Sequence, residues 1–223
     1  MSTKFKVYLL AAAINALAMA LVVVGIQAQT VPIHFNYAGE ADWWASKWFY
    51  LIFAFIPLAE IGSYKFYRRA NSNNEAVQKN AVIEERVVTL TGLFLAAVGW
   101  FFLLLVRSGE TKLDTSFACL IFTGVGLLMI YISNYMAKIR PNHTLGFRVK
   151  WTLNDETVWI KTHRLSGYTG VIGGVIIIVG SLLGFALNIW LSFAGFALGM
   201  IVMVGIPAVY ARNLYHQLHP DGK

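Results

Sequence analysis

Six apolar stretches dominate the chain, and each is long enough to cross a bilayer as a helix. They cover residues of about 7–28, 48–66, 88–106, 116–136, 169–187 and 190–211. A hydrocarbon core of roughly 30 Å needs about 20 apolar residues in a helix. The pattern therefore predicts an all-α integral membrane protein with six transmembrane helices. Because no Gly/Ser-rich linker interrupts the pattern, we expect a single membrane domain over residues 1–223.

The composition agrees with a membrane location. Hydrophobic residues make up 57% of the chain and charged residues only 13%, whereas soluble domains average roughly 45–50% and 25%. The first stretch follows Lys4 and Lys6 and ends near "GIQAQT", which imitates a secretory signal peptide. Its apolar core is longer than the roughly 7–15 residues of a signal peptide, so we expect a retained span.

The distribution of basic residues predicts the orientation. If the N-terminus is cytoplasmic, fifteen of the 18 Lys and Arg residues fall on the inner side, and only Lys47, Arg107 and Lys112 fall outside. The positive-inside rule then places both termini in the cytoplasm, with an outer cap loop at 29–47 and a cytoplasmic loop at 137–168. The net charge of +7 does not indicate direct nucleic-acid binding, since no basic run is longer than Arg68-Arg69.

Small residues and prolines predict how the spans pack. Three glycine pairs at four-residue spacing occur in the last two spans, where they allow close helix contact. The pairs are Gly170 and Gly174, Gly180 and Gly184, and Gly195 and Gly199. We expect them to pack these two spans into a tight hairpin, with dimer formation as the alternative. Pro57 and Pro207 should kink the second and sixth spans.

Polar side chains inside the spans include Glu60 and Asn15. Glu60 is a candidate proton or cation site, or an anchor for a basic residue of the 137–168 loop, because ionisable groups in membranes are often functional. The alternative is a carboxylate that pairs with Lys65 or an arginine near the headgroups. Asn15 in the first span is expected to form an interhelical hydrogen bond.

The outer cap loop carries polar and aromatic side chains that form a candidate ligand-contact surface. They are His34, Asn36, Glu40, Asp42 and Trp43. The alternatives are a folded cap without a ligand, with the tryptophans in an interfacial belt, and a metal site. The metal reading is weak because the spacing matches no familiar ligand pattern.

The inner segment "WTLNDETVWIKTHRL" predicts a short helix at about 154–166, ended by Gly167. Thr152, with Asp155 three residues later, resembles a capping box at its start, and Asn154 is a competing N-cap. Four-residue spacing places Asp155, Trp159 and His163 on one face. Tryptophan and basic residues suggest that this helix lies on the membrane surface at headgroup depth.

The run "SNYMAKIRPNHTLGFRVKWTLNDETVWIKTHRLSG" resembles the signature of the SdpI family of bacterial membrane immunity proteins. The matching positions are Asn134, Tyr135, Lys138, Pro141, Asn142, Gly146, Arg148, Trp151, Thr152, Leu153, Glu156, Val158, Trp159, Thr162, His163 and Arg164. The segment between Pro32 and Lys47 is similar to a small domain of unknown function that often precedes this signature. Val149-Lys150 replaces the family's Thr-Pro, and Ser133 replaces its usual glycine.

The resemblance implies a multi-pass protein of the bacterial cell membrane that protects its producer from a secreted peptide toxin. It also implies, for some members, that a small transcriptional repressor is held at the membrane. On this reading the five outer residues become candidate toxin contacts. The candidate bracing or partner-binding residues are Asn134, Lys138, Asn142, Arg148, Trp151, Glu156, Trp159, His163 and Arg164. As braces, Arg148 and Arg164 would pair with Glu60, Glu84 or Glu85, and Asn134 would tie the fourth span to the inner loop.

Two other classes of function compete with immunity. A small transporter or proton-coupled exporter would use Glu60, His163 and Asn134, although no inverted repeat is visible. An intramembrane hydrolase would need paired catalytic carboxylates or an HExxH motif, and the chain has neither. His216 and His219 lie one turn apart in what we expect to be a frayed tail. We therefore expect a binding protein in contact with membrane lipid, not an enzyme, with no cofactor and no metal.

Overall fold

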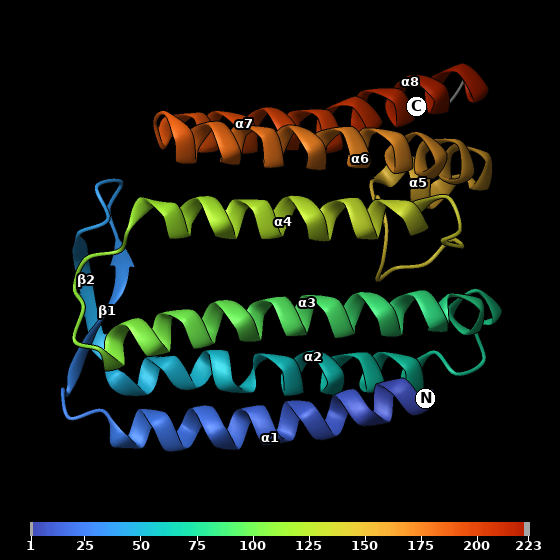
Figure 1. Cartoon of the computed structure of the whole chain (residues 1–223). Coiled ribbons are helices and arrows are strands. Elements are labelled where there is room, and N and C mark those ends of the chain that lie inside the picture. The colour runs from blue at the N-terminus through green and yellow to red at the C-terminus, as the bar shows by residue number, and fades with distance from the viewer. Residues whose placement is uncertain (1, 221–223) are drawn as a thin grey trace. The chain divides into compact units, whose positions relative to one another are not determined.

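The computed structural model describes residues 2–220 and contains six long apolar helices. Turns, one strand pair and a long loop with a short helix connect them (Figure 1). The long helices are α1 (Thr3–Gly25), α2 (Leu51–Ala70), α3 (Glu75–Arg107), α4 (Thr115–Met136), α6 (Glu156–Ala186) and a continuous run of α7 (Trp190–Met200), the π-helical turn η2 (Ile201–Gly205) and α8 (Ile206–Leu218). Each is long and apolar enough to cross a membrane. The prediction of six transmembrane helices is confirmed.

Contacts divide the chain into two compact units, although the sequence shows no linker. The first unit comprises Met1–Ser72 and Glu85–Ala118, and the second comprises Asn73–Glu84 and Cys119–Lys223. Helix α3 contributes its first residues to the second unit and the rest to the first.

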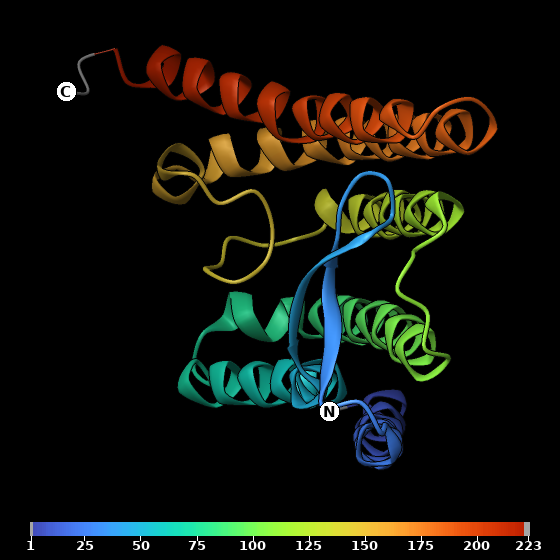
Figure 2. The same cartoon turned by 90° about the vertical axis from the view of Figure 1, so that its left-hand side faces the viewer.

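The first unit has a polar and aromatic hairpin at one end of its helices. Strands β1 (Thr30–Phe35) and β2 (Ala41–Ser46) pair antiparallel, as the blue strands of Figure 2 show. The 3-10 turn η1 (Lys47–Tyr50) leads from β2 into α2. The buried Tyr50 hydroxyl donates to the carbonyl of Pro32 at 2.7 Å. The Lys47 ammonium donates to the carbonyl of Ile26 at 2.6 Å, where a cation also complements the C-terminal end of α1.

One polar contact between helices of the first unit was predicted from the sequence. The indole nitrogen of Trp100 in α3 donates to the side-chain oxygen of Asn15 in α1 at 2.7 Å. Asn15 thus forms the interhelical hydrogen bond expected of it.

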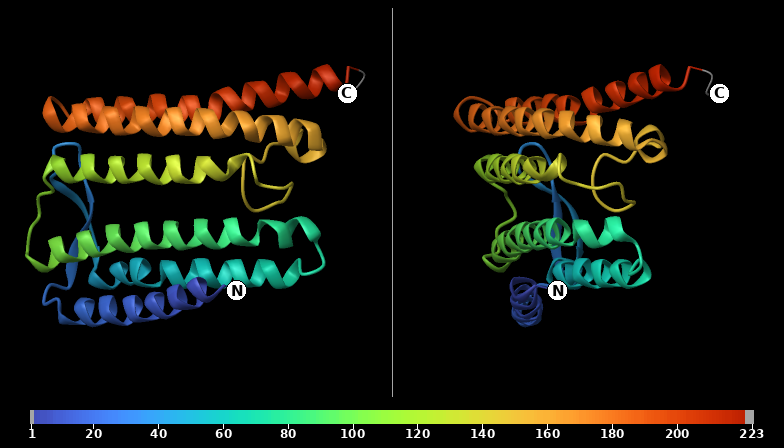
Figure 3. Two further views of the ribbon diagram at one scale, coloured as in Figure 1. Left: turned by 45° about the vertical axis from the view of Figure 1, so that its right-hand side comes forward. Right: turned by 90° about the vertical axis from the view of Figure 1, so that its right-hand side faces the viewer.

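The second unit is built on the hairpin of α6 and α7, which lie side by side in both views of Figure 3. A Cβ on Gly180 would lie 2.6 Å from the Cα of Gly195, so neither position has room for a larger residue. The predicted close packing of the last two spans is confirmed at this pair. Gly170 differs, because it faces Ser133 of α4 instead of α7.

The last span changes from α-helix to π-helix just before Pro207, where the sequence predicted a kink. The turn η2 ends at Gly205, and Pro207 occupies the first turn of α8. A π-helical turn is a common way for a helix to accommodate a disturbed hydrogen-bond ladder.

The predicted separate helix at 154–166 is wrong. The short helix of the inner loop is α5 (Lys150–Asn154), and residues from Glu156 onwards already belong to α6. Gly167 lies inside α6 and does not end a helix. Because a glycine in a helix costs only about 1 kcal/mol, continuous packing on both sides can override this stop signal.

Candidate functional site

The candidate site is the start of α6 together with the loop that precedes it. Asp155 is the N-cap of α6, and its carboxylate accepts a hydrogen bond from the backbone N–H of Val158 at 2.8 Å. The carboxylate also lies 3.0 Å from Nε2 of His219, just after α8. The Val158 bond first, and the His219 bond second, hold the pKa of Asp155 below its usual range. Asp155 thus joins the start of one helix to the end of another.

Trp159 and His163 form the buried centre of this site. Their rings stack with centroids 3.9 Å apart and planes 19° apart, and both side chains are almost fully buried. The indole nitrogen of Trp159 donates to the carbonyl of Ile139 at 2.9 Å. The predicted shared face is confirmed for these two residues. The Trp159 indole is 0% exposed, so it packs inside the protein and does not contact the membrane surface as expected.

The hydrogen bonds of His163 determine its tautomer. Nε2 accepts from the backbone N–H of Phe147 at 3.0 Å, and Nδ1 lies 2.9 Å from the carbonyl of Trp159. An N–H can only donate and a carbonyl can only accept, so the ring is neutral with its proton on Nδ1. Gly146, at φ +110°, lies against Nε2, where a Cβ would overlap the ring. His163 therefore holds the loop and has no free nitrogen for a ligand.

The loop from 137 to 149 is ordered by two buried asparagines. The side-chain oxygen of Asn142 accepts from the N–H groups of Thr144 and Leu145 at 2.8 Å and 2.7 Å. Asn80, near the start of α3, accepts from the N–H of Arg140 at 2.9 Å and donates to its carbonyl at 3.0 Å. The two asparagines thus give these backbone groups the partners that a loop without regular structure otherwise lacks.

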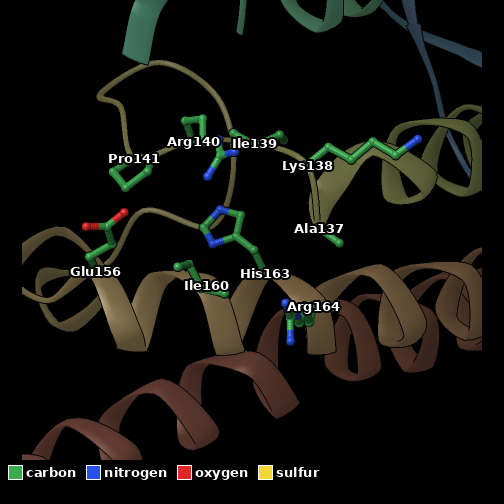
Figure 4. Close-up of a pocket in the computed structure, with 9 residues that line it drawn as sticks. All are labelled: Ala137, Lys138, Ile139, Arg140, Pro141, Glu156, Ile160, His163 and Arg164. Atoms are coloured by element: carbon green, nitrogen blue, oxygen red, sulfur yellow. The ribbon is translucent and has the colours of Figure 1, made fainter. Parts of the chain in front are cut away.

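Between this loop and α6 lies a pocket of about 360 Å³ (Figure 4). Its walls include Ile139, Ile160 and the His163 ring, and its charged lining consists of Lys138, Arg140, Glu156 and Arg164. The pocket combines an apolar floor with three cations and one carboxylate.

Several predicted bracing residues have other partners. Arg148 donates to the carbonyl of His143, so its expected pairing with Glu84 is wrong. Asn134 is exposed and donates to the carbonyl of Ile130 in its own helix at 2.8 Å, so it does not tie α4 to the loop. The Lys150 ammonium lies 5.4 Å from the centre of the Trp151 ring. Arg164 is exposed at the pocket.

The structure brings the five outer candidates together on the β1–β2 hairpin. Nδ1 of His34 lies 2.6 Å from the carboxylate of Asp42, with both side chains exposed. The side-chain oxygen of Asn36 accepts from the N–H of Glu40 at 3.0 Å, within the turn that joins the strands. Trp43 is 66% exposed. The hairpin thus presents the exposed indole of Trp43 beside the pair of His34 and Asp42.

Glu60 lies in the first unit with one carboxylate oxygen buried and without a hydrogen-bond partner. The hydroxyl of Tyr8 in α1 is also buried and without a hydrogen-bond partner. Both approach Gly92 of α3, where an added Cβ would overlap the hydroxyl and lie 2.8 Å from the carboxylate. Among residues 2–220, Glu60 forms no ion pair with Lys65.

Sequence reasoning missed Asn80 and His219. Asn80 is fully buried, and the buried positions Val77, Asn80 and Glu84 recur at helical spacing. That spacing was the available signal, because a polar residue on a buried helix face needs a partner. His219 had no comparable signal, since Asp155 is 64 residues away. The expected frayed tail is wrong, because α8 continues to Leu218 and His219 contacts Asp155.

Two family models and one known protein match parts of this chain. Residues 138–211 match the SdpI/YfhL protein family, and residues 11–58 match a domain of unknown function, DUF1648. The protein named Immunity protein SdpI, from Bacillus subtilis (strain 168), is 36% identical over 92 residues. That match covers 39% of this chain and 44% of the relative, so it spans less than half of the relative's length. No solved structure matches.

The fold and the site define the class of the molecule. Six apolar helices and the bacterial relative make it a multi-pass protein of a bacterial membrane. The segment 138–211, which contains Trp159, His163 and their loop, is similar to the SdpI/YfhL protein family. The resemblance found in the sequence is confirmed.

Proposed function

We propose that this protein is a membrane immunity protein that protects its producer from a secreted peptide toxin. The observation that carries the proposal is the overlap between the family match at 138–211 and the buried network of Trp159 and His163. Three residues that match the signature, Asn142, Trp159 and His163, form hydrogen bonds that hold the loop. A related protein is named for immunity, and we transfer that role to this chain as a hypothesis.

The hairpin β1–β2 is the surface that we propose for the toxin. Exposed indoles are strong anchors for peptides, because they bury a large apolar area with few rotatable bonds. Trp43 supplies such an anchor, and the His34–Asp42 pair supplies polar groups beside it. Under the orientation predicted from the basic residues, this hairpin faces the side from which a secreted peptide arrives.

Expression in a sensitive bacterial host tests the proposal. Challenged with conditioned medium from the producer, cells that express the protein should survive better than cells with an empty vector. Trp43→Ala should reduce survival without reducing the amount of protein in the membrane. Trp190→Ala is the matched control, since Trp190 is also exposed, at 57%, but lies on α7. Unchanged sensitivity in cells with confirmed membrane expression contradicts the proposal.

A signalling role would use the inner loop. We propose that exposed charges around the start of α6, including Glu156, Lys161 and Arg164, offer a surface for a small transcriptional repressor. Capture on toxin binding requires two states with different affinity for the repressor, because a ligand shifts an equilibrium only by its differential affinity. A fluorescent repressor should move to the membrane when toxin is added. Equal membrane signal with and without toxin excludes signalling but leaves immunity untouched.

A small transporter or proton-coupled exporter is the second candidate. The specific observation in its favour is the unpartnered oxygen of Glu60 beside the unpartnered hydroxyl of Tyr8. In proteoliposomes with a pH-sensitive dye inside, wild type would carry a proton flux that Glu60→Gln abolishes. If wild type carries no flux and Glu60→Gln still protects cells, the carboxylate is not a transport site.

We also propose that the protein acts by binding and not by catalysis. Both ring nitrogens of His163 are engaged in holding the loop, so this histidine cannot serve as a general base without breaking the network. Loss of toxin from the medium as cleaved fragments, detected by mass spectrometry, would contradict this.

A further inference from the structure

We propose that the pocket beside His163 binds a phosphate group, carried by an anionic lipid headgroup or present as free phosphate. Its volume of about 360 Å³ falls at the small end of ligand pockets, which span roughly 300–1,000 Å³. Three cationic side chains and one carboxylate line it. This excess of positive charge in a concave site favours an anion.

The three cations are available for a ligand. Within the part of the chain that the structure describes, Lys138, Arg140 and Arg164 form no ion pair. All three are exposed. In Figure 4, Arg140 is directed towards His163, while the charged ends of Lys138 and Arg164 point away from His163. Their long side chains can turn towards an anion, and two arginines provide the planar donor groups that suit phosphate oxygens.

The backbone that carries Arg140 is held in place before any ligand binds. Asn80 bonds both the N–H and the carbonyl of Arg140. Trp159 bonds the carbonyl of the preceding residue, Ile139. A binding group on a rigid frame loses less entropy when it binds, so its contacts contribute more to affinity.

The length of α6 places the pocket at the depth of lipid phosphates. The helix has 31 residues, or about 46 Å at 1.5 Å per residue, whereas the hydrocarbon core needs only about 20 residues. All its charged residues, Glu156, Lys161 and Arg164, lie in the first nine positions. The uncharged remainder therefore fills the hydrocarbon, and the start of α6 lies among the headgroups.

The carboxylate of Glu156 favours a phosphate headgroup that also carries hydroxyl groups. A carboxylate repels phosphate but accepts hydrogen bonds from hydroxyl groups. A glycerol headgroup offers hydroxyls next to its phosphate, so phosphatidylglycerol matches both the cations and Glu156. Phosphatidylcholine carries a compensating positive charge and no hydroxyls, and it matches neither.

The test is a binding titration of the full-length protein purified in detergent. Short-chain phosphatidylglycerol, short-chain phosphatidylcholine and inorganic phosphate are titrated separately, with heat of binding as the signal. Phosphatidylglycerol should bind saturably, and Arg140→Gln and Arg164→Gln should each weaken it at least tenfold. Lys161→Gln is the matched control, because it removes the same charge from α6 outside the pocket and should leave the affinity unchanged.

The outcomes separate the two sources of phosphate. Tighter binding of phosphatidylglycerol than of inorganic phosphate assigns the site to a lipid headgroup, whereas binding of phosphate alone assigns it to the free ion. The proposal is overturned if neither binds, if phosphatidylcholine binds as well as phosphatidylglycerol, or if Lys161→Gln weakens binding as much as Arg164→Gln. Equal melting temperatures of the variants show that a lost affinity is not a lost fold.

Discussion

Replacement of Trp159 removes the side chain on which the inner loop depends. The indole is fully buried, stacks on His163 at 3.9 Å and donates to Ile139 at 2.9 Å. Trp159→Ala leaves a cavity and should lower the free energy of unfolding by about 3–5 kcal/mol. Trp159→Phe keeps a stacked ring but leaves the Ile139 carbonyl without its donor, which should cost about 1–3 kcal/mol.

Unfolding by a denaturing detergent, followed by circular dichroism, measures both costs. The matched control is Trp190→Phe. Because the Trp190 ring is exposed, this replacement should change the free energy of unfolding by less than about 0.5 kcal/mol. If Trp159→Ala costs no more than this control, Trp159 does not brace the loop and the account of the site is wrong. If Trp159→Phe costs as much as Trp159→Ala, the hydrogen bond to Ile139 and not the stacked ring carries the effect.

Two further predictions concern helix contacts. Gly180→Ala places a Cβ 2.6 Å from the Cα of Gly195 and should lower the free energy of unfolding by about 1–3 kcal/mol in the same assay. Gly62→Ala is the control, because its Cβ would have no atom within 4 Å. Equal effects of the two replacements would refute the tight hairpin contact. Asp155→Ala removes the α6 N-cap and should cost about 1 kcal/mol at pH 7. Because folding lowers the pKa of Asp155, its carboxylate stabilises the fold above the unfolded value of about 3.9 and loses this effect as pH falls through the folded pKa. Melting temperatures should therefore converge below about pH 4, and a constant difference at all pH values would contradict this reading.

The six helices could be predicted from the sequence because the length of an apolar stretch is a local property. A bilayer imposes that length on each span separately, so no tertiary contact is needed to recognise it. The boundary of α6 was not predictable in this way. Gly167 and the charges before it favour a separate surface helix, but burial of Val158, Trp159 and Thr162 inside the protein extends α6 back to Glu156.

The candidate site could likewise be predicted where it depends on local spacing, but not where it depends on residues distant in the sequence. Spacing alone placed Trp159 and His163 on one face, which their stacking confirms. Their partners Ile139 and Phe147 lie 20 and 16 residues away, and Asn80 lies 60 residues from Arg140. Hydrogen bonds over such separations depend on how the loop returns to α6, which no sequence spacing encodes.

Survival of the producing strain tests the proposed immunity most directly. A strain lacking this gene is grown in conditioned medium of its parent and is complemented with wild type, Trp43→Ala or Trp190→Ala at equal membrane abundance. We predict that the deletion strain dies, that wild type and Trp190→Ala restore growth, and that Trp43→Ala restores it only in part. Full growth of the uncomplemented deletion strain, in medium that kills an unrelated sensitive strain, would contradict the account.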